Sequence, residues 1–193
     1  MKSRVTTGNG DGGVTRSIAG EVLPKDHPVM EACGKLDSLR AQTALLRLQL
    51  LESSQGDKEE LAEFLLWLLH VYFLMGTELN DPKRIKPEYR AGEVGATHLE
   101  KVETLQGQME AGLDLPKSFL VTATNVLAAQ CDVLATVARD VERSVVTLKT
   151  TVPEFNETHM LKLLNRLSDF YFILGRHVEG GEHQPVDYGV LEG

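Results

Sequence analysis

Cysteine is scarce in this sequence, which limits the kinds of protein it can be. The 193 residues include only Cys33 and Cys131, and each lies inside a helical pattern. Two such cysteines argue against a disulfide framework, so both are expected to be packing residues in a reducing compartment. There is no H-E-x-x-H motif, no Ser-His-Asp set and no clustered Cys/His metal site. We therefore expect a cytoplasmic protein that has no protein cage for a metal.

Positive charge is also in short supply. The chain carries 20 Lys and Arg against 28 Asp and Glu, a formal net charge of -8. Binding a nucleic-acid backbone requires a basic surface, and this composition does not supply one. The short basic run Lys83, Arg84 and Lys86 is interpreted as a solvated loop. No nucleic-acid partner is expected.

Apolar runs long enough to cross a bilayer are missing as well. The longest, residues 64–76 (FLLWLLHVYFLMG), is shorter than the roughly 20 residues that a membrane helix needs, and it contains His70. It predicts a buried helix and no membrane partner. Lys2 and Arg4 are followed by Thr, Gly and Asn, so no secretory signal is expected.

Helical periodicity dominates what the sequence does contain. Apolar residues recur at helical spacing in five stretches, and no strand-like alternation accompanies them. These stretches predict helices over about 28–53, 57–80, 93–112, 125–150 and 156–177. In the first, the core stripe is expected to be Leu36, Leu39, Ala44, Leu48 and Leu51. The sequence thus predicts an all-α, antiparallel five-helix bundle over 28–178, with a glycine-rich arm (1–27) before it and a mobile tail (179–193) after it.

The arm contains glycines at 8, 10, 12 and 13 within TTGNGDGGVT. Such a segment can wrap phosphate oxygens with its backbone N–H groups, because glycine allows positive φ. A disordered tail has the same composition, and both interpretations stay open. The arm lacks the G-x-x-x-x-G-K-[ST] order and no strand precedes it, which argues against a P-loop fold.

Two helices carry polar faces that could form a nucleotide site. Arg139, Glu142 and Arg143 share one face of the fourth helix, where two guanidinium groups and a carboxylate could hold a polyphosphate and orient its nucleoside. On the fifth helix, Asn165 and Asp169 share a side, and packing of the two helices would bring Asn165 close to Arg139 and Glu142. Ordinary solvated helix surfaces are the alternative for both faces.

Five separated motifs resemble one known family. NGDGGVT resembles T-G-D-x-G-x-T, LPKDHP resembles S-K-D-D-P, CGKLDSL matches Y-G-x-L-D-E-L, VARDVER matches V-C-R-R-A-E-R, and LLNRLSDFYFILGR matches Y-L-N-R-L-S-D-x-L-F-x-L-A-R. In this order and spacing they are similar to the PduO-type ATP:cob(I)alamin adenosyltransferases, from about residue 8 to residue 178.

The resemblance implies a five-helix bundle that assembles as a homotrimer, with active sites between subunits. It implies transfer of the 5′-deoxyadenosyl group of ATP, with its Mg²⁺, to reduced cobalamin, giving adenosylcobalamin and triphosphate. A reductase and an adenosylcobalamin-dependent enzyme are the implied partners. The implied ATP-binding residues are Thr7, Gly8, Gly10, Gly13, Thr15, Lys25, Arg139, Glu142, Arg143 and Asn165, of which Arg139 and Asn165 are also catalytic.

On the corrinoid side or the interface, the resemblance implies Asp37, Phe119 and Asp169. Phe119 falls where the family has an aromatic residue against the lower face of the corrin and is counted with the catalytic residues. A core position at a helix entry is its alternative. Asp37 matches an aspartate whose family partner is an arginine on helix four of an adjoining subunit, and that position is Ala135 here. We expect Asp37 to recruit Arg40 or Arg139 or to be exposed. We also expect Ala135→Arg to tighten cobalamin binding, or to raise kcat/KM for cobalamin, by about tenfold.

The sequence departs from the family pattern at several positions. Residues 122–124 (TAT) replace P-G-G, residues 132–135 (DVLA) replace His-x-Ala-Arg, and Asp140 replaces the second arginine of the Arg-Arg pair. Asn9 and Ser38 are further replacements. Two hypotheses follow: an active corrinoid adenosyltransferase, or a diverged ATP- or corrinoid-binding protein that acts in regulation or cofactor delivery.

Overall fold

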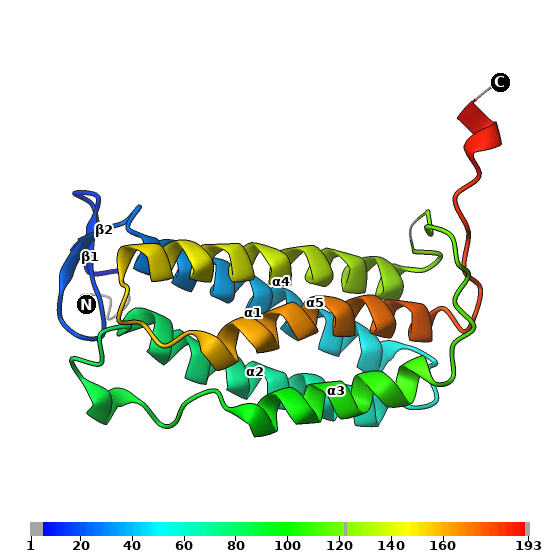
Figure 1. Ribbon diagram of the computed structural model, residues 1–193, viewed down its shortest axis with the longest axis horizontal. Coiled ribbons are helices and arrows are strands. Elements are labelled where there is room, and N and C mark those ends of the chain that lie inside the picture. Colours follow the sequence, from blue (N-terminus) through cyan, green and yellow to red (C-terminus); the bar gives the residue numbers. More distant parts are fainter. Residues whose placement is uncertain (1–5, 122, 192–193) are drawn as a thin grey trace.

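The computed structural model describes residues 6–121 and 123–191 of the chain. Residues 1–5, 122 and 192–193 lie outside the described residues. They include Lys2 and Arg4, on which the expectation of no secretory signal was based, and the first residue of the 122–124 stretch. Five long helices lie side by side along one axis (Figure 1): α1 (Pro28–Glu52), α2 (Lys58–Asn80), α3 (Ala96–Glu110), α4 (Val126–Thr151) and α5 (Thr158–Val178). The expected five-helix bundle is confirmed. Two short 3-10 helices, η1 (Pro87–Tyr89) and η2 (Tyr188–Leu191), lie outside it.

Local sequence signals explain where the helices begin. Pro28 occupies the first position of α1, where its missing N–H costs nothing, and His27 Nδ1 accepts from Val29 N at 3.2 Å. Asn125 caps α4 by accepting from Ala128 N at 2.9 Å. The third helix is shorter at its start than expected, since residues 93–95 are an extended lead-in rather than a helical turn.

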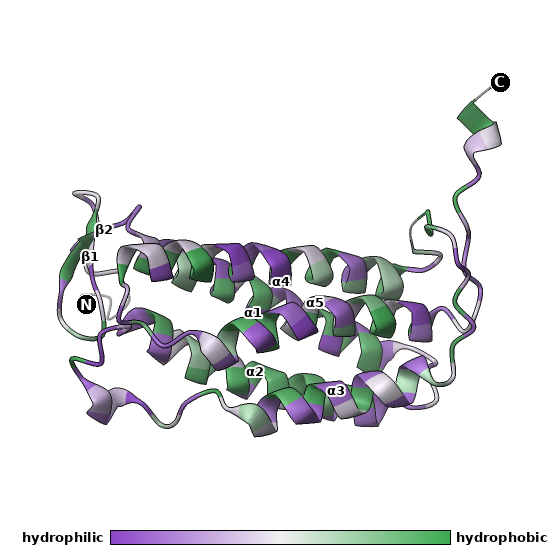
Figure 2. Ribbon diagram, viewed as in Figure 1, coloured by the Kyte–Doolittle hydropathy of each residue, from purple (hydrophilic) through white to green (hydrophobic). Residues whose placement is uncertain are grey.

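The core lies between the inward faces of the five helices. Figure 2 shows hydrophobic and hydrophilic residues alternating along the long helices, as a one-sided core requires. The expected core residues of α2 and α5 are buried: Leu61, Phe64, Leu65, Leu68, Tyr72, Met75, Leu164, Leu167, Tyr171 and Leu174. Helix α3 packs on α5 and supplies Val102 and Met109 from a narrow apolar stripe.

The stripe expected for α1 is wrong after Leu39. Leu46 and Leu50 are buried, whereas Leu48 is 56% exposed and Leu51 is 36% exposed. Residues 45–52 (LLRLQLLE) place leucine on every side of the helix, so their spacing does not select a face. Thr43, not Ala44, is the buried residue of that turn, because its hydroxyl bonds Tyr171 Oη at 2.8 Å inside the core.

The arm contains strands that the sequence did not predict. Strands β1 (Val14–Arg16) and β2 (Val22–Pro24) pair antiparallel and form a hairpin at one end of the bundle (Figure 1). Ile18 N donates to Asn80 Oδ1 at 2.5 Å, and Lys83 pairs with Glu21 at 2.9 Å, so the hairpin is tied to the end of α2. Three-residue strands are too short to show alternation, and for that reason the expectation of no strand was wrong.

Helix α2 is the one helix in the described part of the chain that is long and apolar enough to cross a membrane by length and composition. The apolar run 64–76 alone was too short for that, but the full helix is longer. Leu65, Leu68 and Met75 are buried in the bundle, as expected of a core helix.

Candidate functional site

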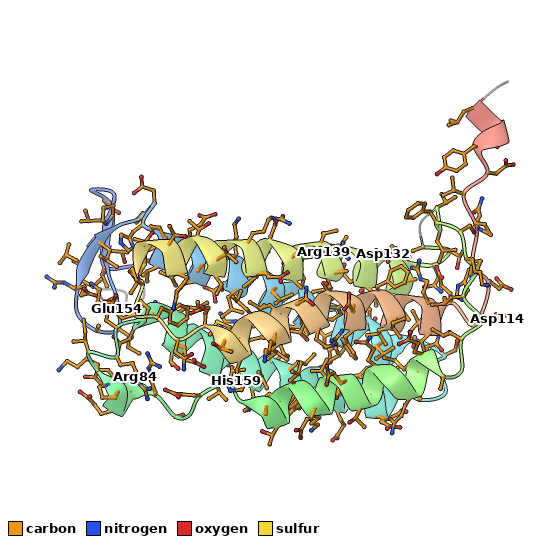
Figure 3. All side chains as sticks on the ribbon, viewed as in Figure 1. Arg84, Asp114, Asp132, Arg139, Glu154 and His159 are labelled. Carbon is orange, nitrogen blue, oxygen red and sulfur yellow. The ribbon has the colours of Figure 1, made fainter. Side chains whose placement is uncertain are left out.

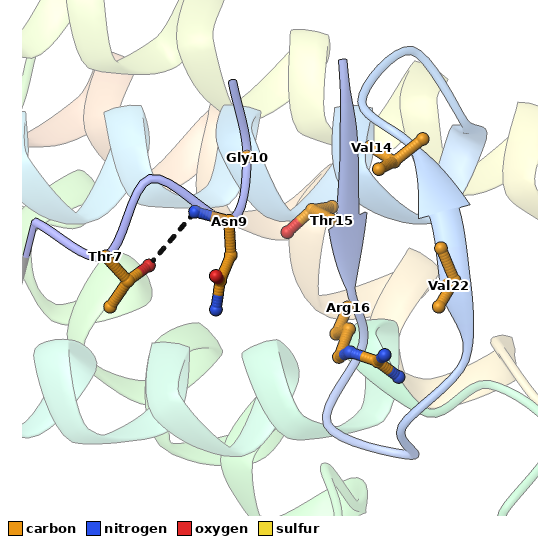
Figure 4. A pocket seen from close by; sticks show the side chains of 7 residues that line it. All are labelled: Thr7, Asn9, Gly10, Val14, Thr15, Arg16 and Val22. Atoms are coloured by element: carbon orange, nitrogen blue, oxygen red, sulfur yellow. Dashed lines mark hydrogen bonds between the residues drawn. The ribbon is translucent and has the colours of Figure 1, made fainter. Parts of the chain in front are cut away.

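The arm forms a pocket of about 530 Å³ (Figure 4). Gly8 and Gly13 adopt φ of 73° and 78°, a left-handed conformation that favours glycine. Thr7 Oγ1 accepts from Asn9 N at 3.4 Å, which shapes the entry to the loop. Three of the sequence-predicted site residues, Thr7, Gly10 and Thr15, line the pocket. The other lining residues are Asn9, Val14, Arg16 and Val22.

Lys25 lies directly against this glycine loop. Its backbone N–H donates to Gly13 O at 2.9 Å, and a Cβ added to Gly10 would lie 3.0 Å from its Nζ. The absence of a side chain at Gly10 therefore lets the ammonium approach the loop. Loop amides and an ammonium in this arrangement can hold anionic oxygens.

Sequence reasoning missed Arg16 as a pocket residue. Its Nη1 donates only to the carbonyl of Gly20, at 3.3 Å, within the hairpin. The guanidinium lines the same pocket as Thr15, and a basic residue directly after the motif threonine was the available signal.

Helices α4 and α5 bring the second predicted group together. Asn165 Nδ2 donates to Glu142 Oε1 at 3.3 Å, so the predicted approach of these two residues is confirmed. Arg143 forms an ion pair with Asp140, one turn earlier on α4. In the described ranges, Arg139 has neither a hydrogen bond nor an ion pair, and its guanidinium is exposed.

Arg139 shares a pocket of about 470 Å³ with Asp169, Phe172 and residues of α3. Asp169 Oδ2 accepts from Arg166 Nη1 at 3.0 Å, so its charge is already partly balanced. The structure thus places Arg139 with Asp169 rather than in direct contact with Asn165.

One chain does not bring the arm and the α4/α5 face together. The hairpin lies at the end of the bundle where α4 finishes (Figure 1), while Arg139 lies near the middle of α4 (Figure 3). About 12 residues separate Arg139 from Thr151, which is roughly 18 Å of helix. A ligand that contacts both groups would need the arm of a second chain.

Phe119 lies at the opposite end of the bundle from the arm. Its side chain is 80% exposed, so the alternative of a core position is wrong. It lines a pocket of about 340 Å³ with Pro116, Leu120, Phe172 and an ion pair, Asp132 with Arg176. The pocket is therefore apolar with one charged pair in its wall.

The ion pair in this pocket is part of a buried network that sequence reasoning did not identify. Arg176 is only 1% exposed, and its guanidinium lies 3.1 Å from Asp132 and 3.1 Å from Glu179 Oε2. Burial raises the pKa of Asp132, and the nearby Arg176 charge opposes that shift. An arginine inside an otherwise apolar run near the end of α5 was the available signal.

Asp37 was expected to pair with Arg40 or Arg139 or to be exposed, and the structure confirms both the exposure and the pairing with Arg40. Asp37 is exposed, and its carboxylate pairs with Arg40 at 2.8 Å. The expectation that Ala135 faces an adjoining subunit is wrong, because Ala135 is 4% exposed and packs in the core of its own chain. Ala135→Arg would force a guanidinium into that core and is now expected to destabilise the fold instead of restoring a bridge.

Comparison with solved structures shows the fold. A variant of the PduO-type ATP:corrinoid adenosyltransferase from Lactobacillus reuteri, complexed with cobalamin and ATP, matches with a TM-score of 0.83 over 96% of both chains, at 23% identity. A second variant, complexed with ATP, matches with a TM-score of 0.79 over 95% of this chain and 100% of that chain, at 23% identity. The bundle therefore has the corrinoid adenosyltransferase fold.

Sequence comparison then shows the family. The family model described as cobalamin adenosyltransferase matches residues 5–178. The corrinoid adenosyltransferase of Bacillus subtilis is 31% identical over 175 residues, which is 91% of this chain and 86% of that protein. The chain belongs to the cobalamin adenosyltransferase family, as its motifs indicated.

The relatives differ in length. This chain spans about half, 51%, of the corrinoid adenosyltransferase PduO of Citrobacter freundii, to which it is 28% identical over 192 residues. It spans 93% of a second corrinoid adenosyltransferase from the same organism, at 26% identity over 173 residues.

Asp140→Asn should strengthen ATP binding by about two- to fivefold. Asp140 neutralises Arg143 through an exposed pair, and such pairs are worth up to about 1 kcal/mol, so releasing Arg143 gives at most that much to a phosphate. Calorimetric titration with MgATP at low and high salt would measure the change, with the exposed loop variant Asp114→Asn as the control. Unchanged or weaker binding by Asp140→Asn would remove Arg143 from the phosphate site.

Proposed function

We propose that this protein transfers the 5′-deoxyadenosyl group of ATP to cob(I)alamin. The observation that carries the proposal is the unpaired Arg139 guanidinium on the helix face that also holds the Glu142–Asn165 contact. A guanidinium on the same helix face as a carboxylate–amide pair can bind phosphate while that pair orients the nucleoside. Family membership supports the reaction class.

The arm is proposed to hold the triphosphate. The backbone N–H groups of the loop around Gly8, Gly10 and Gly13 would donate to phosphate oxygens, together with the Thr7 and Thr15 hydroxyls. Lys25, which already lies against Gly10, would add a charge-assisted contact. Arg139 and Arg143 of a neighbouring chain would close the site from the other side.

The reaction needs position and charge more than a reactive side chain. The electron pair of Co(I) attacks the 5′ carbon of ATP, a Co–C bond forms, and the C–O bond breaks so that triphosphate leaves with its electron pair. Glu142 and Asn165 would hold the nucleoside, and Arg139 would stabilise the charge that develops on the leaving triphosphate. Because cobalt is the nucleophile, no Ser, Cys or Lys nucleophile is required.

Mg²⁺ is proposed to arrive bound to the ATP phosphates. Among residues 6–121 and 123–191 there is no group of three or more His, Cys, Asp or Glu side chains that could hold a metal ion. Phosphate oxygens and water suit Mg²⁺ and would complete its coordination.

The corrinoid is proposed to sit at the Phe119 end of the bundle. An exposed phenyl ring beside an apolar pocket can cover one face of the corrin and exclude a lower axial ligand, which would make reduction to Co(I) easier. Asp169 and Asp37 are proposed to lie on this corrinoid side or at the subunit interface. A cytoplasmic reductase and an adenosylcobalamin-dependent acceptor enzyme are the partners that this chemistry requires.

A homotrimer is proposed because a single chain leaves the arm apart from the α4/α5 face and leaves an apolar surface exposed. Helices α1 and α2 meet where Arg40 lies over the Phe73 ring, 4.7 Å from its centroid. The exposed apolar side chains of these two helices include Leu45, Leu48, Leu66 and Phe73. Exposed apolar surface of this kind marks protein contacts.

Light scattering should therefore report a particle of about three times the 21.3 kDa chain mass. Leu48→Glu, which places a charge on the exposed apolar surface, should shift the particle toward the monomer at micromolar concentration. The exposed loop variant Asp114→Asn should leave the mass unchanged. A wild-type monomer at that concentration would contradict the shared site.

An anaerobic assay with chemically reduced cobalamin and MgATP tests the proposed reaction. The proposal expects the spectrum of adenosylcobalamin to appear only when both substrates are present. Binding of either substrate without product would favour the alternative of a diverged binding protein.

A further inference from the structure

The loop that carries Phe119 is hydrogen-bonded to the C-terminal tail on both sides of Leu120. Val121 N donates to Gln184 O at 2.9 Å, and Val186 N donates to Phe119 O at 2.8 Å. These two bonds make an antiparallel bridge centred on Leu120 and Pro185. Phe119 is 80% exposed and Val121 is 46% exposed, so the loop contacts the core through Leu115 and Ala123 on either side and not through Phe119.

The tail is in turn anchored by two buried polar side chains. His183 Nδ1 lies 3.0 Å from Glu179 Oε2, and the two side chains are 4% and 1% exposed. Glu179 Oε1 accepts from Thr124 N at 2.7 Å, just before the start of α4. Glu179 thus joins the end of α5, the segment leading into α4 and the tail.

The same carboxylate is tied to the wall of the Phe119 pocket. Arg176 Nε lies 3.1 Å from Glu179 Oε2, an ionic contact without hydrogen-bond geometry, and Arg176 Nη2 donates to both oxygens of Asp132 at 3.1 Å. Buried charges tolerate few arrangements, because leaving one unpaired is costly. His183 Nε2 has no hydrogen-bond partner among the described residues, so Nδ1 alone holds the ring.

We propose that residues 179–186 form a clasp that sets the position of Phe119 over the corrinoid pocket, with Glu179 and His183 as positioning residues. The inference rests on the proposed function for the identity of the ligand, a corrinoid. The mobility expected for the tail stays a prediction, and the structure shows residues 184–186 bonded to the Phe119 loop. Without the clasp, the loop would sample many conformations, and the corrinoid would have to order it on binding.

Two truncations separate the clasp from the rest of the tail. Ending the chain after Glu182 removes His183 and both backbone bonds to the loop. Ending it after Asp187 keeps them and removes residues 188–193, of which 188–191 are exposed. In the shorter protein, the Val121 amide should exchange with solvent at least about tenfold faster, since its hydrogen bond is gone. In the longer protein and the full chain, that amide should stay protected.

The kinetic consequence should fall on one substrate. For the shorter protein, KM for cobalamin should rise about tenfold while KM for ATP changes by less than about twofold, because the arm lies at the other end of the bundle from the tail (Figure 1). A spectroscopic titration with cob(II)alamin should show the same loss of affinity without requiring turnover.

Point variants test the side-chain anchor. His183→Ala removes the donor to Glu179 and should reproduce much of the truncation effect. His183→Asn keeps a donor at the position of Nδ1 and should recover most of the cobalamin affinity. Circular dichroism would check that the bundle is intact in each variant.

Equal Val121 exchange in both truncations would overturn the clasp, and faster exchange with unchanged cobalamin affinity would overturn its positioning role. A full chain that binds no cobalamin at all would overturn the proposed function and with it this role. Equal cobalamin affinity in the full chain and in the chain that ends at Glu182 would overturn the positioning role and leave the proposed function standing.

Discussion

Arg139→Ala should lower the affinity for MgATP by about 10- to 100-fold and leave folding nearly unchanged. A charge-assisted hydrogen bond to phosphate is worth about 1.5 to 3 kcal/mol, which corresponds to that range in dissociation constant. In the described parts of the chain the guanidinium has no hydrogen bond or ion pair, so its removal breaks neither kind of bond within the fold. Calorimetric titration of both proteins would measure the difference.

Lys162→Ala is the matched control for this effect. Lys162 is an exposed cation on α5, and its removal changes the net charge by the same amount as removal of Arg139. The control should keep the wild-type affinity for MgATP. If the two variants bind alike, Arg139 acts only through net charge or lies outside the site.

Arg176→Met should lower the free energy of unfolding by about 3 to 5 kcal/mol. The guanidinium is 1% exposed and balances Asp132 and the buried Glu179, so its loss leaves carboxylates without a counter-charge. Breaking a buried pair by removing one partner typically costs that much. Chemical denaturation followed by circular dichroism would give the difference between variant and wild type.

Arg40→Met measures the loss of stability when an exposed ion pair is broken, for comparison with the buried Arg176 pair. Arg40 and Asp37 form an exposed bridge, with side chains 36% and 64% accessible, and such pairs contribute about 0 to 1 kcal/mol. The two methionine variants should therefore differ severalfold in their cost. Similar small losses from both would mean that the Arg176 network does not stabilise the Phe119 end of the bundle.

The helices could be predicted because their causes are local. Pro28 and Asn125 mark helix starts by their own backbone and side-chain chemistry, and the stripes of α2 and α5 recur at helical spacing. The inward face of α1 could not be predicted past Leu39, since leucine surrounds that part of the helix. The hairpin and the bridge between Leu120 and Pro185 depend on partners distant in sequence, which periodicity does not register.

In the candidate site too, the contacts that follow from helix packing could be predicted, and those taken from motif positions could not. The approach of Asn165 to Glu142 followed from antiparallel packing of α4 and α5, which the sequence predicted. The placement of Ala135 was wrong because it came from a motif position. The buried residues Ala128, Cys131 and Ala138 lie seven and four residues before Ala135 and three residues after it. That helical spacing puts Ala135 on the same buried face and would have corrected the prediction.

The most direct test of the proposed reaction follows both products in one anaerobic experiment. Wild-type protein is mixed with MgATP and chemically reduced cobalamin, and adenosylcobalamin is measured by its spectrum and its loss on illumination while triphosphate is measured in the same samples. The account predicts that the two products appear together, in equal amounts, and that Arg139→Ala slows both. Triphosphate without adenosylcobalamin, or neither product from protein that binds both substrates, would contradict adenosyl transfer by this chain.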